Sequence, residues 1–207
     1  DRLTIEGGRK LAGAVHAVMP DRIELGTIAC AAALTDGELR LTHADPALLA
    51  AAGPLFAAAG VEMLAEPGGL LVRRAAGGLR GIDLHTRPYP GFATDLQAPS
   101  MALLATAAGA SAITETIFEQ RFGHVDELRK MGASIAVHGA TAWVRGVARL
   151  RGARVTAGDV RAAAALVLAG LAAEGDTVLD GLEHLDRGYD RMAEKLAACG
   201  AIIGRTA

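Results

Sequence analysis

The stretch "RAAAALVLAGLAA", residues 161–173, is apolar almost without interruption after its first residue. Alanine, leucine and valine would occupy every face of a helix with 3.6 residues per turn. A helix that is apolar on all sides is buried on all sides, because no face of it favours water. The segment therefore predicts a helix in the interior of the molecule. Gly175 follows closely and is suited to end this helix.

The same order of features occurs three times along the chain. Each copy has Leu-x-Gly, an aspartate suited to a helix start, an alanine- and leucine-rich helix, a strand, a second helix and a short last strand. The aspartates are Asp21, Asp95 and Asp159, and the glycines that should end the helices are Gly37, Gly109, Gly175, Gly60, Gly132 and Gly200. We predict three β-α-β-α-β(β) units at residues 11–74, 79–146 and 150–207. The closing strands are expected at 61–64, 134–137 and 201–204.

Units of this size cannot bury their own apolar faces and should pack against one another. The first helices are the most apolar, whereas second helices such as "HVDELRKMG" (124–132) carry more charge. We therefore expect one α/β domain over residues 1–207, with the first helices inside and the sheets outside.

The composition excludes several classes of function. The formal charge of −2 gives no electrostatic case for binding nucleic acid. The polar start and the short, glycine-interrupted apolar runs predict neither a signal peptide nor a membrane span, so we expect a soluble, cytoplasmic protein. Cys30 and Cys199 are expected to be buried thiols in a reduced compartment. No residue spacing suggests a metal site, and no cofactor is expected.

The stretch "TRPYPGFATDLQAPS", residues 86–100, places one carboxylate at a helix entrance. Two prolines stiffen the approach to Asp95, and the following helix fixes the exit. A general base must be held within hydrogen-bond reach of its proton, so this rigidity makes Asp95 a candidate base. The alternative from the residues alone is a helix N-cap without chemistry.

Arg121 in "FEQRFGH" and Arg187 in "HLDRGYD" occupy matching places in the second and third units. Two guanidinium groups on equivalent loops are suited to an anion with several oxygens. The first unit has no arginine there, which argues against a purely structural feature of the repeat. The alternative is a pair of surface arginines that bind Glu119 or Asp186.

Four stretches together resemble the C-terminal half of the UDP-N-acetylglucosamine 1-carboxyvinyltransferase family, the enolpyruvyl transferases of peptidoglycan synthesis. They are "MPDRIELGT", "PYPGFATDLQA", "ITETIFEQRFGHVDELRKMGA" and "VRAAAALVLAGLAAEGDTVLDGLEHLDRGYDRMAEKLAACGA", and they cover nearly the whole chain. The resemblance implies one domain of a two-domain inside-out α/β barrel. It also implies transfer of enolpyruvyl from phosphoenolpyruvate to the 3-hydroxyl of UDP-N-acetylglucosamine, with release of phosphate.

The resemblance also assigns residues. It implies that Asp95 contacts the sugar hydroxyl, that Arg121 and Arg187 lie on the phosphoenolpyruvate side of the cleft, and that Ile117 contacts the nucleotide-sugar. Asp159, followed by Arg161, is expected near the reacting phosphoenolpyruvate. The expected catalytic residues are Asp95, Asp159 and Arg187, and the expected substrate-binding residues are Asp95, Ile117, Arg121, Arg161 and Arg187. The chain departs from the family pattern at Pro99, Gln120 and Gly158, where Gln, Asn and Thr are usual.

Several parts of the family's machinery are missing from this chain. The catalytic acid on a mobile loop, the Lys-Asn pair for phosphoenolpyruvate and most arginines for the uridine diphosphate belong to the other domain. We therefore expect the chain alone to be inactive and its partner to be the missing second domain of the same enzyme. Two alternatives stay open: a domain acting on 3-phosphoshikimate, and a non-catalytic domain that kept the fold.

Overall fold

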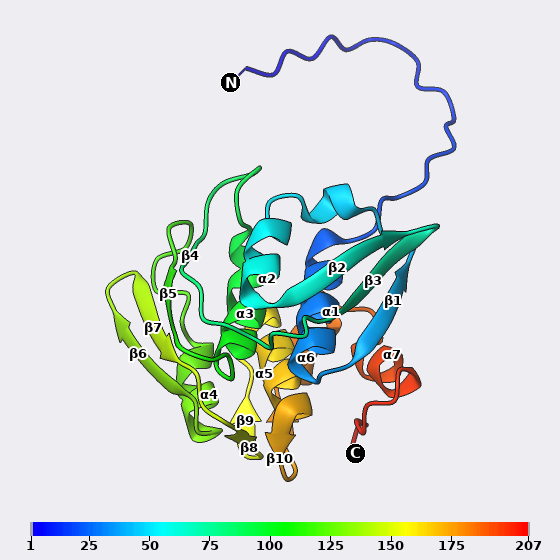
Figure 1. The fold of residues 1–207 in the computed structure, drawn as a ribbon. Coiled ribbons are helices and arrows are strands. Elements are labelled where there is room, and N and C mark those ends of the chain that lie inside the picture. Colours follow the sequence, from blue (N-terminus) through cyan, green and yellow to red (C-terminus); the bar gives the residue numbers. More distant parts are fainter. Residues whose placement is uncertain (1, 207) are drawn as a thin grey trace.

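Three helices form the centre of the molecule in the computed structural model, which describes residues 2–206 (Figure 1). These are α1 (Arg22–Leu34), α3 (Gln97–Leu104) and α5 (Val160–Ala172), and each packs against the other two. In α5 the residues from Ala162 to Ala169 are all buried. The helix predicted from the apolar stretch is therefore present and lies in the interior. Its small alanine side chains allow the neighbouring helices to approach closely.

Strands cover this helical centre on its outer sides. The first sheet has the antiparallel order β1-β3-β2 and packs on α1; the second has the order β4-β5-β7-β6 and packs on α3. Two short parallel pairs, β8 with β10 and β9 with β11, lie beside α5. The strands of the two larger sheets are β1 (Glu38–Thr42), β2 (Val61–Glu66), β3 (Gly69–Arg74), β4 (Leu84–His85), β5 (Ala110–Thr114), β6 (Ser134–His138) and β7 (Thr141–Arg145). The paired short strands are β8 (Leu150–Arg151), β9 (Arg154–Thr156), β10 (Ala173–Glu174) and β11 (Val178–Asp180).

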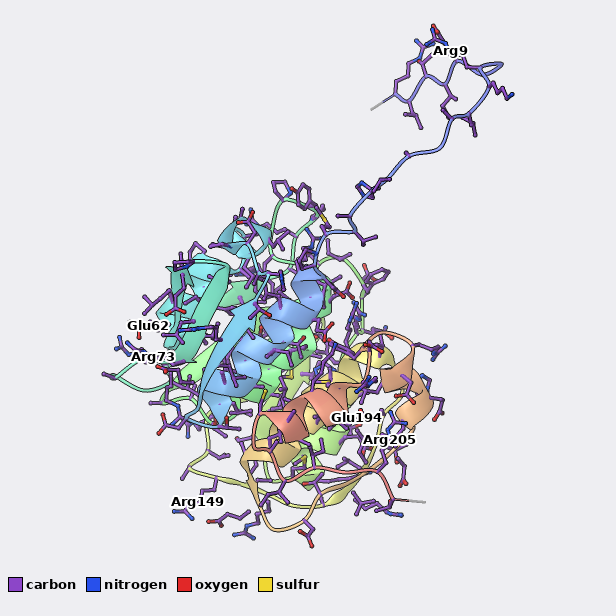
Figure 2. The ribbon with its side chains drawn as sticks, turned by 90° about the vertical axis from the view of Figure 1, so that its right-hand side faces the viewer. Arg9, Glu62, Arg73, Arg149, Glu194 and Arg205 are labelled. Carbon is purple, nitrogen blue, oxygen red and sulfur yellow. The ribbon has the colours of Figure 1, made fainter. Side chains whose placement is uncertain are left out.

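The remaining helices are short and lie around the centre. They are η1 (Pro46–Leu49), α2 (Gly53–Ala59), η2 (Thr94–Leu96), α4 (His124–Lys130), α6 (Leu182–Asp186) and α7 (Met192–Ala198). Alternation decides which strand residues reach the core. In β7, Ala142 and Val144 are buried, whereas Trp143 between them is 55% exposed. On the outer side of the first sheet, Arg73 forms an ion pair with Glu62 (Figure 2).

Gly60 shows why glycine ends a helix in this fold. It follows α2 with a φ of 91°, in the left-handed region that other residues avoid. A Cβ added there would lie 2.2 Å from the carbonyl oxygen of Gly78. The glycine is thus required both by the backbone conformation and by the close approach of the chain that follows β3.

The predicted α/β architecture, with helices inside and sheets outside, is confirmed, although the described strands form four separate sheets rather than one closed barrel. Three local predictions were wrong. Gly37, Gly109 and Gly175 do not end the inner helices, whose C-caps are Thr35, Ala105 and Ala173. Residues 201–204 do not form the expected strand, and residues 2–20 contain neither a helix nor a strand and extend away from the folded part (Figure 1). The division into three units at 11–74, 79–146 and 150–207 stays a prediction.

Candidate functional site

Asp95 differs from the two aspartates that were predicted to be equivalent to it. Asp21 caps α1 by accepting a hydrogen bond from the backbone N–H of Ile23, and Asp159 caps α5 in the same way through Arg161. Asp95 caps nothing, because it lies inside the 3₁₀ turn η2 that runs directly into α3. Its carboxylate is therefore free to face other side chains, and the N-cap alternative does not hold for this residue.

Two guanidinium groups from different parts of the chain meet this carboxylate. Nη1 of Arg121 lies 3.0 Å from Oδ1 of Asp95, and Nε of Arg161 lies 3.2 Å from the same oxygen. The side chains are 36% exposed for Asp95, 22% for Arg121 and 15% for Arg161, so solvent reaches the carboxylate more than the arginines. Burial by itself would raise the pKa of Asp95, but the charges of Arg161 and Arg121 together hold it below its ordinary value.

Arg161 is held from its other side by an aromatic ring. Its guanidinium carbon lies 5.5 Å from the ring centre of Tyr189, within the distance of a cation–π contact. The Tyr189 hydroxyl in turn lies 3.0 Å from Oγ1 of Thr27 on α1. Burial tends to lower the pKa of Arg161, but Tyr189 and Asp95 raise it overall, so the guanidinium stays charged. Its Nη1 is buried and has no hydrogen-bond partner among the described residues, and its contact to Asp95 is an ion pair without hydrogen-bond alignment.

A second, fully buried carboxylate lies behind this cluster. Glu115 follows β5 directly and is 0% exposed. Its Oε1 accepts hydrogen bonds from the hydroxyl of Thr86 and from the backbone N–H groups of Ile117 and Phe118. Its Oε2 accepts one from the hydroxyl of Thr94, which itself accepts a hydrogen bond from Nη1 of Arg121. Glu115 is thus connected to the Asp95 cluster through a single threonine.

His124 adds a neutral imidazole near the cluster. It begins α4, is 2% exposed, and its Nε2 has no hydrogen-bond partner among the described residues. Burial lowers the pKa of His124 to about 4, although the charge of Asp159 acts in the opposite direction and that of Arg121 in the same one.

The structure does not bring every predicted residue to this cluster. Arg187 ends α6, is exposed, and contacts the imidazole of His184. Its neighbour Asp186 pairs with Arg205 instead, so the alternative of an Arg187–Asp186 pair is also wrong. The second guanidinium on Asp95 is therefore Arg161. Ile117 is half-buried, and its backbone N–H is 2.8 Å from Glu115.

Sequence reasoning missed Thr94, Glu115 and Tyr189. A signal for Glu115 was present in the strand "SAITETIF" (111–118), where alternation places Ser111, Ile113 and Glu115 on one face. All three are buried, at 2%, 0% and 0% exposed. A carboxylate in register with core residues must be satisfied by hydrogen bonds from elsewhere in the fold.

The described residues contain no group of three or more histidine, cysteine, aspartate or glutamate side chains that could hold a metal ion. Within the same part of the chain, no helix is both long and apolar enough to cross a lipid bilayer. Two cavities, of about 180 and 390 Å³, are lined by residues other than those of the Asp95 cluster.

Comparisons with known proteins connect this arrangement to a family. Residues 1–196 match the family model described as EPSP synthase (3-phosphoshikimate 1-carboxyvinyltransferase). Among curated relatives, the UDP-N-acetylglucosamine 1-carboxyvinyltransferases of Granulibacter bethesdensis and Gluconacetobacter diazotrophicus are 56% and 57% identical over 203 residues, which is 98% of this chain. These matches cover 48% of each relative, so the chain spans about half the length of the curated relatives it matches.

Solved structures also match this chain. The enolpyruvyl transferase NikO from Streptomyces tendae superimposes with a TM-score of 0.84 at 33% identity, over 91% of this chain and 45% of that one. An EPSP synthase from Acinetobacter baumannii matches with a TM-score of 0.56 at 20% identity, over 80% of this chain and 42% of that one, which shows a shared fold alone. The match to the family model over nearly the whole chain shows that this protein belongs to the EPSP synthase (3-phosphoshikimate 1-carboxyvinyltransferase) family.

Proposed function

We propose that the chain is one domain of an enzyme that transfers the enolpyruvyl group of phosphoenolpyruvate to the 3-hydroxyl of UDP-N-acetylglucosamine. The observation that carries this proposal is the half-exposed Asp95 carboxylate held between Arg121 and Arg161. The names of relatives that are 52–57% identical favour the nucleotide-sugar as acceptor over 3-phosphoshikimate. A domain that only kept the fold would have no reason to hold these charges together.

Asp95 is the proposed base for the sugar hydroxyl. The closest contact of each guanidinium is to Oδ1, which leaves Oδ2 to face a substrate. As the hydroxyl oxygen bonds to C2 of phosphoenolpyruvate, its proton passes to Asp95 and an acid protonates C3. The resulting tetrahedral intermediate then loses a proton from C3 and expels phosphate, which restores the vinyl group. The lowered pKa keeps Asp95 ionised at neutral pH and therefore able to accept the hydroxyl's hydrogen bond.

The arginines are the proposed anion-binding groups. The buried Nη1 of Arg161 has no hydrogen-bond partner within residues 2–206, and such a donor favours an oxygen-rich ligand at this point. Arg121 lies beside it, and Arg187 is exposed on the loop after α6, where it could reach a ligand held between domains. Asp159 places its charge near the start of α5 and His124, and Ile117 is the proposed contact to the nucleotide-sugar.

A second domain is required in this proposal, since the described part of the chain places no acid for C3 in the cluster and the Asp95 carboxylate is partly exposed to solvent. The two domains would close over the ligands, and the chain alone would be inactive. The complete enzyme would act in the cytoplasm at the first committed step of peptidoglycan synthesis, and so support cell shape and cell division.

The experiment joins this chain to the N-terminal half of the Granulibacter bethesdensis relative, which supplies the part that the chain does not cover. Phosphate release is measured with phosphoenolpyruvate and either UDP-N-acetylglucosamine or 3-phosphoshikimate. We expect turnover with the nucleotide-sugar only, its loss in Asp95→Asn, and none from the 207-residue chain alone. Turnover with 3-phosphoshikimate would support the alternative acceptor, and full activity of Asp95→Asn would refute the role of Asp95.

A further inference from the structure

Glu115 holds three separate segments together at the point where they meet the site. Its donors are Thr86, which follows β4, Thr94 in η2, and the backbone of Ile117 and Phe118 in the loop after β5. The four distances are 2.7, 2.8, 2.8 and 3.1 Å, all within the normal range. No cation pairs with this carboxylate among the described residues, so hydrogen bonds alone compensate its burial.

The hydroxyl of Thr94 has one proton, and that proton is used on Glu115. Towards Arg121 the same hydroxyl can therefore only accept a hydrogen bond, and it does so from Nη1 at 3.0 Å. The nitrogen that binds Thr94 is also the one that lies 3.0 Å from Asp95. The direction of the Thr94 hydroxyl thus decides whether Arg121 meets an acceptor or a donor beside the carboxylate.

We propose that Glu115 is a positioning residue for the site: through the Thr94 hydroxyl it orients the Arg121 guanidinium against Asp95. This inference rests on the proposed function only for its catalytic consequence, because the orientation itself is a property of the folded chain. Glu115 does not exchange protons with substrate in this role, since both of its oxygens are occupied by donors and it is fully buried.

Glu115→Gln is a sharp test because it keeps the shape of the side chain, replaces one acceptor oxygen with an NH₂ donor and removes the charge. Three donors meet at Oε1, so the glutamine oxygen should stay there and its NH₂ group should face Thr94. Thr94 would then accept from the amide as well as from Arg121, which uses both of its lone pairs, and its own proton would lose the acceptor that fixes it. The hydroxyl would no longer be held in one orientation, and Arg121 would no longer be held in its place beside Asp95.

The first measurement follows the pKa of Asp95 by carbon NMR in the 207-residue chain, without any turnover. The charges that act on this pKa are those of Arg161 and Arg121, not that of Glu115, so loosening Arg121 in Glu115→Gln should raise it. Thr94→Val removes the connecting hydroxyl and should also raise the pKa of Asp95. It leaves the hydrogen bonds from the backbone of Ile117 and Phe118 to Glu115 in place, so it keeps the test available if Glu115→Gln does not fold. Glu119→Gln is the matched control, because Glu119 is exposed on the same loop, and it should leave the pKa of Asp95 unchanged.

The second measurement uses the joined two-domain enzyme described above. We expect Glu115→Gln and Thr94→Val each to lower kcat/KM about tenfold or more, mainly through the KM for phosphoenolpyruvate, and the double variant to be no worse than either. Wild-type-like Asp95 pKa and kinetics in both folded variants would overturn the inference. The joined wild-type enzyme could also be inactive while Glu115→Gln still raises the pKa of Asp95 in the 207-residue chain. That result would refute the proposed function and support the role of Glu115.

Discussion

Replacing Asp95 with asparagine should destabilise the folded chain at neutral pH. The change removes the charge that Arg121 and Arg161 share, at 3.0 and 3.2 Å, and leaves two guanidinium groups close together. Because Asp95 is 36% exposed, solvent screens each pair, and we assign about 0.5–1 kcal/mol to each contact. With the repulsion left behind, the total loss is about 2 kcal/mol, which lowers the Tm of a chain of this size by about 4–8 °C.

The pH dependence of this loss has a definite sign. The pKa of Asp95 is lower in the folded chain than its ordinary value of 3.8. The stabilisation is therefore fully present above that ordinary value and disappears as the pH falls through the lower folded pKa. The difference in Tm between wild type and Asp95→Asn should be constant from neutral pH down to about pH 5 and then shrink.

The assay is thermal unfolding of both proteins, followed by circular dichroism over this pH range. Asp176→Asn is the matched control, because Asp176 is exposed and the same substitution there should change the Tm by less than about 1–2 °C. An Asp95→Asn protein that is as stable as wild type at neutral pH would refute the reasoning. It would show that the burial of the carboxylate costs as much as the two arginines contribute.

Three further outcomes are expected. Tyr189→Phe should lower the free energy of unfolding in urea by about 1 kcal/mol, because it removes the hydrogen bond to Thr27. Adding Thr27→Val should lower it little further, and full additivity of the two changes would contradict this hydrogen bond. Gly60→Ala should lower the free energy of unfolding several times more than Gly200→Ala does. Both glycines have a left-handed backbone, but only at Gly60 would an added Cβ press against other backbone atoms. Equal losses of stability in denaturant unfolding would contradict this. A thiol reagent at mildly alkaline pH should leave Cys30 unmodified until the chain unfolds, since burial raises its pKa to about 12, and rapid native-state labelling by mass spectrometry would contradict it.

Some features of the fold were predictable because they depend on neighbours in sequence. The α5 helix is interior since its residues leave no polar face, and the capping by Asp21 and Asp159 needs only the first turn of each helix. The same reasoning was wrong for Asp95, because a 3₁₀ turn precedes α3 and moves the carboxylate away from a cap position. It was also wrong for Cys199, which is exposed.

The sequence by itself determined the inner helices, the capped starts of α1 and α5 and the alternation that buries Glu115, since each follows from local periodicity and the conformational limits of single residues. Only the tertiary structure decided which charges meet. It paired Asp95 with Arg161 rather than Arg187, and it joined Glu115 to Thr86 and Thr94 across 29 and 21 positions. Such contacts depend on how α3, α5 and the loop after β5 pack around one another, and no local pattern encodes that packing.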